Sequence, residues 1–267
     1  MLRRCVGMCL ILFAWQAHSD YPLILAANRD EFYARATAPA GFWDDHPQIL
    51  AGRDLEQGGT WLGIHRSGRL AALTNYRDGR AASRGTRSRG ELVSGFLTSD
   101  LASEEYLQQV HRKHSAYDGF NLLIGTPDRL FSYSNRSEQL AEVEPGVHGL
   151  SNHLLDSPWP KVEQGKAALR ELRDSNPDAM VERLLAVLAN RAPAPDDTLP
   201  DTGIDFERER VLSPAFIATP NYGTRCSTVL LIDTAGRVTF TERTHATDQD
   251  IAQTRRYGFT TTLPITG

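Results

Sequence analysis

The sequence has few cysteines and no long apolar segment. Its 267 residues include three cysteines, Cys5, Cys9 and Cys226, and an odd number cannot all pair within one chain. Neither a Cys-x-x-Cys nor a His-Glu-x-x-His pattern occurs. These absences argue against a disulfide-stapled fold and a zinc motif, and they favour a reducing compartment. Because no apolar run is long enough to cross a bilayer, we expect no integral membrane segment.

The sequence also lacks an excess of positive charge. It holds 29 basic and 33 acidic residues, for a net charge of −4. We therefore expect no nucleic-acid partner. With 40% hydrophobic and 23% charged residues, the composition is that of a globular protein long enough to bury a sizeable core. Collagen-like, low-complexity and wholly disordered chains are excluded.

The N-terminal region allows two interpretations. Two arginines followed by an apolar run at residues 5–15 have the order of a secretory signal peptide. Residues 9–15 also fit a buried β-strand that turns at 16–20 and returns as residues 21–27. Signal cleavage after Ser19 would delete the first strand and leave the second without its hairpin partner. We therefore favour the strand, and with it a cytoplasmic location.

Paired apolar runs around tight turns predict three β-hairpins, at residues 60–75, 119–134 and 227–242. Helical periodicity predicts helices at residues 92–97, 103–113, 160–173 and 178–190. Residues 88–91 fit a capping box and residues 192–210 a surface loop, whereas residues 257–267 fit either an edge strand or a C-terminal end without regular structure. Hairpins and helix pairs in one chain indicate an α+β fold with antiparallel sheets packed against helices.

Polar residues follow the ends of several predicted strands. Arg29 and Asp30 end the second strand, Asn75 ends another, Asn152 follows an apolar step, and Arg225 directly precedes a buried strand. An Asn amide can hold an oxyanion, and an Arg can provide a fixed counter-charge. Each residue also fits a structural role, as an Arg–carboxylate pair, a turn-forming Asn or a surface Arg.

Neither the histidines nor the arginine-rich segment predicts a site by itself. Only His111 and His114 are spaced to share a helix face, and no adjacent carboxylate or cysteine motif completes a metal site. No Cys-x-x-Cys-His motif for haem attachment occurs. We expect no metal and no resident cofactor. Five arginines within a short segment could meet an anionic substrate or a membrane surface, but we interpret them as a solvated loop. They are Arg77, Arg80, Arg84, Arg87 and Arg89.

Several short blocks, in order along the chain, resemble the NRDE family, also called the transport and Golgi organisation protein 2 family. The name NRDE matches Asn28-Arg-Asp-Glu31. The blocks are residues 25–32 (LAANRDEF), 58–64 (GGTWLGI), 70–76 (LAALTNY), 89–93 (RGELV), 119–122 (GFNL), 149–152 (GLSN), 222–225 (YGTR) and 238–243 (VTFTER).

The resemblance also implies a start and a fold. Members begin Met-Cys before an apolar strand, as Met8 and Cys9 do here. We therefore interpret residues 1–7 as an extension from a start codon assigned too early, and residues 8–267 as a single domain. The family is similar to N-terminal nucleophile hydrolases of the choloylglycine and penicillin V acylase type. That similarity implies a four-layer αββα sandwich with antiparallel sheets covered by helices.

The same similarity implies a catalytic set, namely Cys9, Arg29, Asp30, Asn75, Asn152 and Arg225. Removing Met8 would expose the α-amine of Cys9, which can serve as a general base for its own thiol. Arg29 or Arg225 would favour the thiolate, Asp30 would orient the amine, and Asn75 would hold the oxyanion. The implied function is a cysteine amidohydrolase that cleaves a linear C–N amide bond in a small molecule, with the substrate unknown.

The alternative is a non-enzymatic carrier. The family resemblance brings links to haem trafficking and to lipid or acyl-CoA metabolism, so that haem, a lipid or an acyl-CoA would be a cargo of the same pocket. A third possibility is a retired enzyme acting as an interaction protein, which the intact Cys9, Arg29, Asp30 and Asn75 argue against. The sequence leaves the oligomeric state open.

Overall fold

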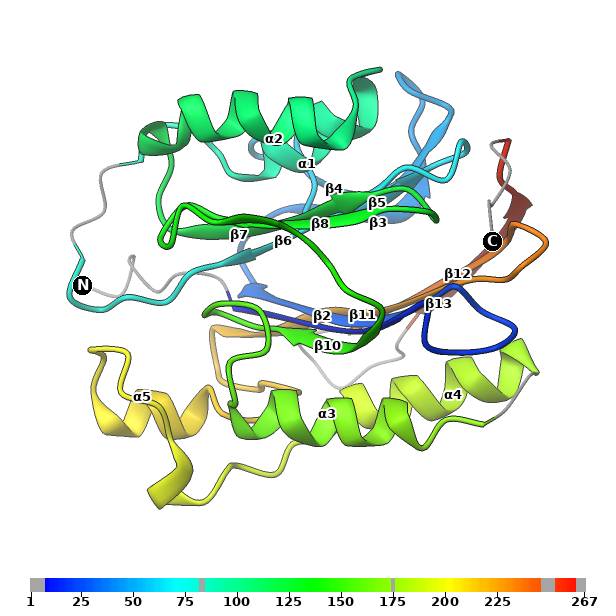
Figure 1. The fold of residues 1–267 in the computed structure, drawn as a ribbon. Coiled ribbons are helices and arrows are strands. Elements are labelled where there is room, and N and C mark those ends of the chain that lie inside the picture. The colour runs from blue at the N-terminus through cyan, green and yellow to red at the C-terminus, as the bar shows by residue number, and fades with distance from the viewer. Residues whose placement is uncertain (1–7, 82–84, 174–175, 246–252, 263–267) are drawn as a thin grey trace.

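Two antiparallel sheets stack face to face in a computed structural model of the chain, with helices on both outer sides (Figure 1). The structure describes residues 8–81, 85–173, 176–245 and 253–262. The proposed extension at residues 1–7 and Arg84 lie outside the described residues.

The first sheet has six strands in the order β10-β1-β2-β11-β12-β13. Their bounds are β1 Cys9–Trp15, β2 Leu23–Phe32, β10 Gly146–Leu150, β11 Tyr222–Ile232, β12 Arg237–Thr244 and β13 Gln253–Thr260. The two predicted N-terminal strands therefore pair with each other between β10 and β11, which come from the middle and the last part of the sequence.

The second sheet has seven strands in sequential order, β3 to β9. Their bounds are β3 Thr37–Phe42, β4 Ile49–Asp54, β5 Leu62–His65, β6 Leu70–Asn75, β7 Phe120–Gly125, β8 Leu130–Ser134 and β9 Leu140–Glu142. The three predicted hairpins are confirmed as β5–β6, β7–β8 and β11–β12.

Helices cover the outer face of each sheet. On the second sheet lie α1 (Gly90–Thr98) and α2 (Ser103–Arg112), and on the first lie α3 (Pro160–Arg170) and α4 (Pro177–Leu188). A short α5 (Phe206–Val211) and two 3-10 turns (His114–Ala116 and Asp196–Thr198) complete the described helices. The predicted four-layer αββα arrangement is confirmed. No helix in the described ranges is long and apolar enough to cross a membrane.

Strand β1 is buried on both faces, which explains its ambiguous sequence. Ile11 and Phe13 enter the core between the sheets, whereas Leu10 and Leu12 pack against the helices α3 and α4. Because successive side chains of a strand point to opposite faces, a strand covered on both sides is apolar without interruption. Such a run has the same composition as the apolar part of a signal peptide. The strand interpretation is confirmed.

Two local predictions are wrong. Arg89, not Ser88, is the N-cap residue of α1, and no side chain caps that helix. Glu91 instead pairs with Tyr117 and Arg87. Residues 192–210 are not simply a surface loop, because they include a 3-10 turn and most of α5, and α5 buries Glu209. Of the two alternatives for residues 257–267, the edge strand is confirmed for the first part by β13, Gln253–Thr260, at the edge of the first sheet, and residues 263–267 lie outside the described residues.

Candidate functional site

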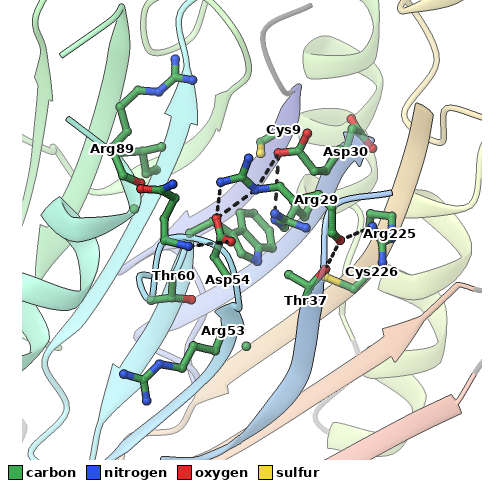
Figure 2. A pocket seen from close by; sticks show the side chains of 18 of the residues that line it. Cys9, Arg29, Asp30, Thr37, Arg53, Asp54, Thr60, Arg89, Arg225 and Cys226 are labelled. Carbon is green, nitrogen blue, oxygen red and sulfur yellow. Dashed lines mark hydrogen bonds and ion pairs between the residues drawn. The ribbon is translucent and has the colours of Figure 1, made fainter. Parts of the chain in front are cut away.

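A cavity of about 730 Å³ opens where β1 begins and β2 ends, and residues from both sheets line it (Figure 2). Five of the six candidate catalytic residues line this cavity; they are Cys9, Arg29, Asp30, Asn75 and Arg225. The sixth, Asn152, is fully buried and is not part of the lining. Tertiary structure thus brings together residues that are more than 200 positions apart in the sequence.

Arg29 lies between two thiols. It pairs with Cys9 on β1 and with Cys226 on β11, so the three side chains share one face of the sheet. Two strand spacings separate the cysteines by roughly 10 Å, which is too far for a disulfide. Both thiols are free. The guanidinium of Arg29 lies 3.7 Å from the carboxylate of Glu31, which partly neutralises its charge.

Cys9 is buried and is preceded by a buried residue. Burial and the nearby Asp30 raise the pKa of the Cys9 thiol, Arg29 opposes the increase, and the resulting pKa is about 12. The backbone N–H of Met8 donates to the hydroxyl of Tyr222 at 2.5 Å, and Met8 packs against Tyr222, Leu212 and Ile217. While Met8 is present, Cys9 has no free amine and its thiol stays protonated at neutral pH.

Asp30 is directed differently from its neighbour Arg29, because adjacent residues of a strand face opposite sides of the sheet. Its Oδ1 accepts a 2.6 Å hydrogen bond from Thr224, and its Oδ2 is buried without a hydrogen-bond partner among the described residues. Burial raises the pKa of Asp30 to about 6, against the lowering effect of Lys161. The backbone N–H of Asp30 donates to the carbonyl of Met8 at 2.8 Å, so Asp30 lies beside the peptide that joins Met8 to Cys9.

A buried ionic cluster that the sequence analysis missed lies behind Asp30. Lys161 of α3 donates to the carbonyl of Leu212 at 3.1 Å, and burial lowers its pKa to about 8. Arg77 forms a buried ion pair with Glu209. Arg77 therefore does not belong to a solvated loop. Arg89 does not either, because it is the partly buried N-cap residue of α1 and lines the cavity. A lysine or glutamate in an otherwise polar helix gives no sequence signal of burial.

Asn152 supports the site from behind. Its amide donates to the backbone carbonyl of Asn75 at 2.9 Å. The hydroxyl of the neighbouring Ser151 donates to the carbonyl of Cys9 at 3.1 Å. These two contacts hold the start of β1 and the end of β6, which belong to different sheets, at a fixed separation. Asn75 itself faces the cavity from the second sheet.

Arg225 occupies an irregular position within β11. The pairing of β11 with β2 shifts register between Thr224 and Cys226, as in a β-bulge. Its Nη1 donates to the carbonyls of Phe32, Tyr33 and Arg35. Arg225 thus fastens the chain that leaves β2, in addition to lining the cavity.

One group of possible metal ligands was also missed. Glu138, from the turn between β8 and β9, lies 3.7 Å from His114, and together with His111 it forms a surface group whose ligand atoms lie within 4.8 Å of one another. The carboxylate comes from a distant segment, so no spacing rule along the sequence could find it.

Residues 8–247 match the family described as Transport and Golgi organisation 2. The chain is 44% identical to the bovine transport and Golgi organization protein 2 homolog, over 88% of this chain and 92% of the relative. It is 41% identical to the human homolog (95% and 99%) and 33% identical to the Drosophila melanogaster protein (89% and 92%).

Among solved structures, the chain is similar to penicillin V acylase from Agrobacterium tumefaciens, with a TM-score of 0.45 and 13% identity over 87% of this chain and 82% of that chain. It is also similar to a Caenorhabditis elegans ortholog of N-acylethanolamine-hydrolyzing acid amidase, with a TM-score of 0.46 and 12% identity over 84% and 92%.

Proposed function

The chain belongs to the transport and Golgi organisation 2 family, and from that premise we propose that it is an N-terminal nucleophile amidohydrolase that uses Cys9. One observation carries the proposal. The thiol of Cys9 lines a cavity at the first residue of β1, beside Arg29 and a buried carboxylate oxygen of Asp30 that has no hydrogen-bond partner among the described residues. An α-amine at Cys9 would supply the missing donor.

The reaction follows from these positions. With Cys9 as the first residue, its α-amine accepts the thiol proton while the sulfur attacks the amide carbon of the substrate. Asn75, on the opposite sheet, faces the same cavity and can donate to the oxyanion. The tetrahedral intermediate collapses as the leaving amine takes the proton from the α-ammonium. Water then hydrolyses the thioester, with the α-amine again acting as the base.

In this scheme Asp30 orients the α-ammonium and Arg29 stabilises the thiolate. Asn152 acts through Asn75, whose carbonyl it holds. Arg225 acts through the chain after β2. The buried Lys161 lowers the pKa of Asp30 and so favours its ionised form.

The cavity favours an enzyme over a carrier of haem or lipid. Six arginines and five acidic residues are among its lining residues; they are Arg29, Arg35, Arg53, Arg87, Arg89, Arg225, Asp30, Glu31, Asp54, Asp118 and Glu242. A site for an acyl chain or a porphyrin is normally dominated by apolar side chains. A polar, ionised lining suits a polar amide.

We also propose a cytoplasmic location. Signal cleavage after Ser19 would remove all of β1, whose seven residues are buried near the middle of the first sheet. N-terminal sequencing and intact-mass measurement of the natively expressed protein test this point. A chain that begins at Cys9 supports both proposals, and a chain that begins after Ser19 contradicts both.

The test of activity compares two buried thiols of one cavity. In a protein that begins at Cys9, a screen of small amides should find hydrolysis that Cys9→Ala abolishes and Cys226→Ala retains. Loss of a nucleophile costs up to roughly a millionfold in kcat in hydrolases of this logic. A Cys9→Ala protein with full amidase activity would refute the proposal. Haem titration of the same variants distinguishes a haem carrier from an enzyme, because a carrier should show the same Soret shift with or without the Cys9 thiol.

A further inference from the structure

The six cavity arginines differ in their partners. Four have a carboxylate within 4.0 Å, namely Arg29 with Glu31, Arg35 with Asp54, Arg53 with Asp45 and Arg87 with Glu91. Arg225 is engaged by three backbone carbonyls. For Arg89, the part of the chain that the structure describes provides one hydrogen bond, from Nη1 to the carbonyl of Gly119 at 3.0 Å, and no carboxylate within ion-pair distance.

Arg89 lines the same cavity as the thiol of Cys9. It is the N-cap residue of α1, on the side of the second sheet, and Ser88 and Gly90 beside it line the same wall. Burial lowers the pKa of Arg89, while Asp118, Cys9 and Glu31 raise it, so Arg89 lies within electrostatic range of Cys9. The positive end of the α1 dipole adds to the same potential.

The geometry of the single hydrogen bond leaves one edge of the guanidinium available. Nη1 is used by Gly119, whereas Nε and Nη2 have no partner among the described residues. These two N–H groups form the parallel fork that binds both oxygens of a carboxylate. Asp118 and Glu31 raise the pKa of Arg89, but no ion pair within the described ranges joins either carboxylate to it. Burying a guanidinium without a paired carboxylate is costly, and an anionic ligand would offset that cost.

We propose that Arg89 determines the specificity of this cavity by binding a carboxylate, so that its substrates are amides that carry a carboxylate, such as N-acyl amino acids. This inference rests on the proposed function. Arg89 binds the carboxylate from the side of the second sheet, while Cys9 on the first sheet attacks the amide carbon.

Two thiol reagents that differ only in charge test this directly. Iodoacetate and iodoacetamide alkylate a thiolate with loss of iodide, and iodoacetate carries the carboxylate. The experiment uses a Cys226→Ala protein that begins at Cys9 and measures the rate at which each reagent alkylates Cys9. The ratio of the iodoacetate rate to the iodoacetamide rate should fall about tenfold or more when Arg89→Gln is added. That follows because a charge-assisted hydrogen bond contributes about 1.5–3 kcal/mol.

Arg87→Gln is the matched control, because Arg87 lines the same cavity but already pairs with Glu91. It should leave the ratio unchanged, and circular dichroism should show that both variants are folded. A ratio in Arg89→Gln within twofold of the parent overturns the inference. If neither reagent modifies Cys9, the proposed nucleophile fails instead.

A binding measurement decides the role of Arg89 independently of the thiol. In a Cys9→Ala protein, calorimetry should show tighter binding of N-acetylglycine than of N-acetylglycinamide, and Arg89→Gln should remove the difference. Equal affinity for the two compounds, or a difference that survives Arg89→Gln, contradicts the inference.

Discussion

Removing Arg77 should destabilise the protein strongly, because it leaves Glu209 as a buried charge without its partner. The two side chains form an ion pair in which each is only 3% exposed. Arg77 also stacks on Trp159 at 4.6 Å. Arg77→Met keeps much of the apolar contact with Trp159 while it deletes the positive charge.

The magnitude follows from what Glu209 retains. Breaking a buried ion pair by removing one partner costs about 3–5 kcal/mol. Glu209 keeps hydrogen bonds from the backbone N–H and the hydroxyl of Thr202, so we expect the lower end, about 3 kcal/mol. The double variant Arg77→Met/Glu209→Gln removes both charges, and Gln can still accept from Thr202. It should cost at least about 1.5 kcal/mol less than the sum of the single variants.

Urea denaturation followed by circular dichroism measures these changes, with the four proteins of the cycle compared at one pH. Glu209→Gln alone should also destabilise, since it leaves Arg77 buried and unpaired. The reasoning is refuted if Arg77→Met costs less than about 1 kcal/mol, or if the double variant loses as much as both single variants together.

Two further predictions concern stability. Gly58 has φ +75°, and a Cβ added there would have no atom within 4 Å, so Gly58→Asn should lower the stability by less than about 1 kcal/mol. A Cβ added at Gly59 would lie 2.6 Å from the backbone carbon of Gly90, so Gly59→Asn should lower the stability by about 1–3 kcal/mol. Thermal denaturation of the two variants tests this difference. Asp156 bonds His148 at 2.7 Å, and although burial opposes the shift, His148 and Lys166 lower its pKa from 3.8 to about 2. The unfolded chain therefore binds the proton more readily, and the stability from Asp156 should be present above pH 3.8 and lost as the pH falls through about 2. Asp156→Asn should remove that part of the acid-induced decrease, and an unchanged acid profile contradicts the assignment.

Local patterns in the sequence determined the hairpins and four of the helices. The hairpins around residues 67–68 and 234–236 combine apolar runs with turn glycines, and Gly68 and Gly236 do adopt positive φ. Such signals depend on residues near one another in the chain. The resemblance of short blocks located Cys9, Arg29, Asp30, Asn75 and Arg225, and the fold places all five around one cavity.

Other predictions failed where long-range contacts override local preference. The Ser88 cap is absent since Glu91 binds Tyr117 and Arg87 instead. The segment at residues 192–210 is polar, yet it includes Glu209, which is buried opposite Arg77. No local pattern indicates that a charged residue has a buried partner 132 positions away.

The sequence by itself determined the local elements and identified the candidate site residues, because strand periodicity, turn glycines and the order of the family's short blocks are all properties of neighbouring residues. Only the tertiary structure decided which of those residues meet in the cavity and which support it from outside. It pairs Arg29 with Cys9 and buries the carboxylate of Asp30 against Thr224, gives Asn152 a supporting position, and leaves Arg89 without a carboxylate partner among the described residues. These outcomes depend on which side chains from distant strands meet at one end of two stacked sheets, and burial and charge pairing there are set by the whole fold.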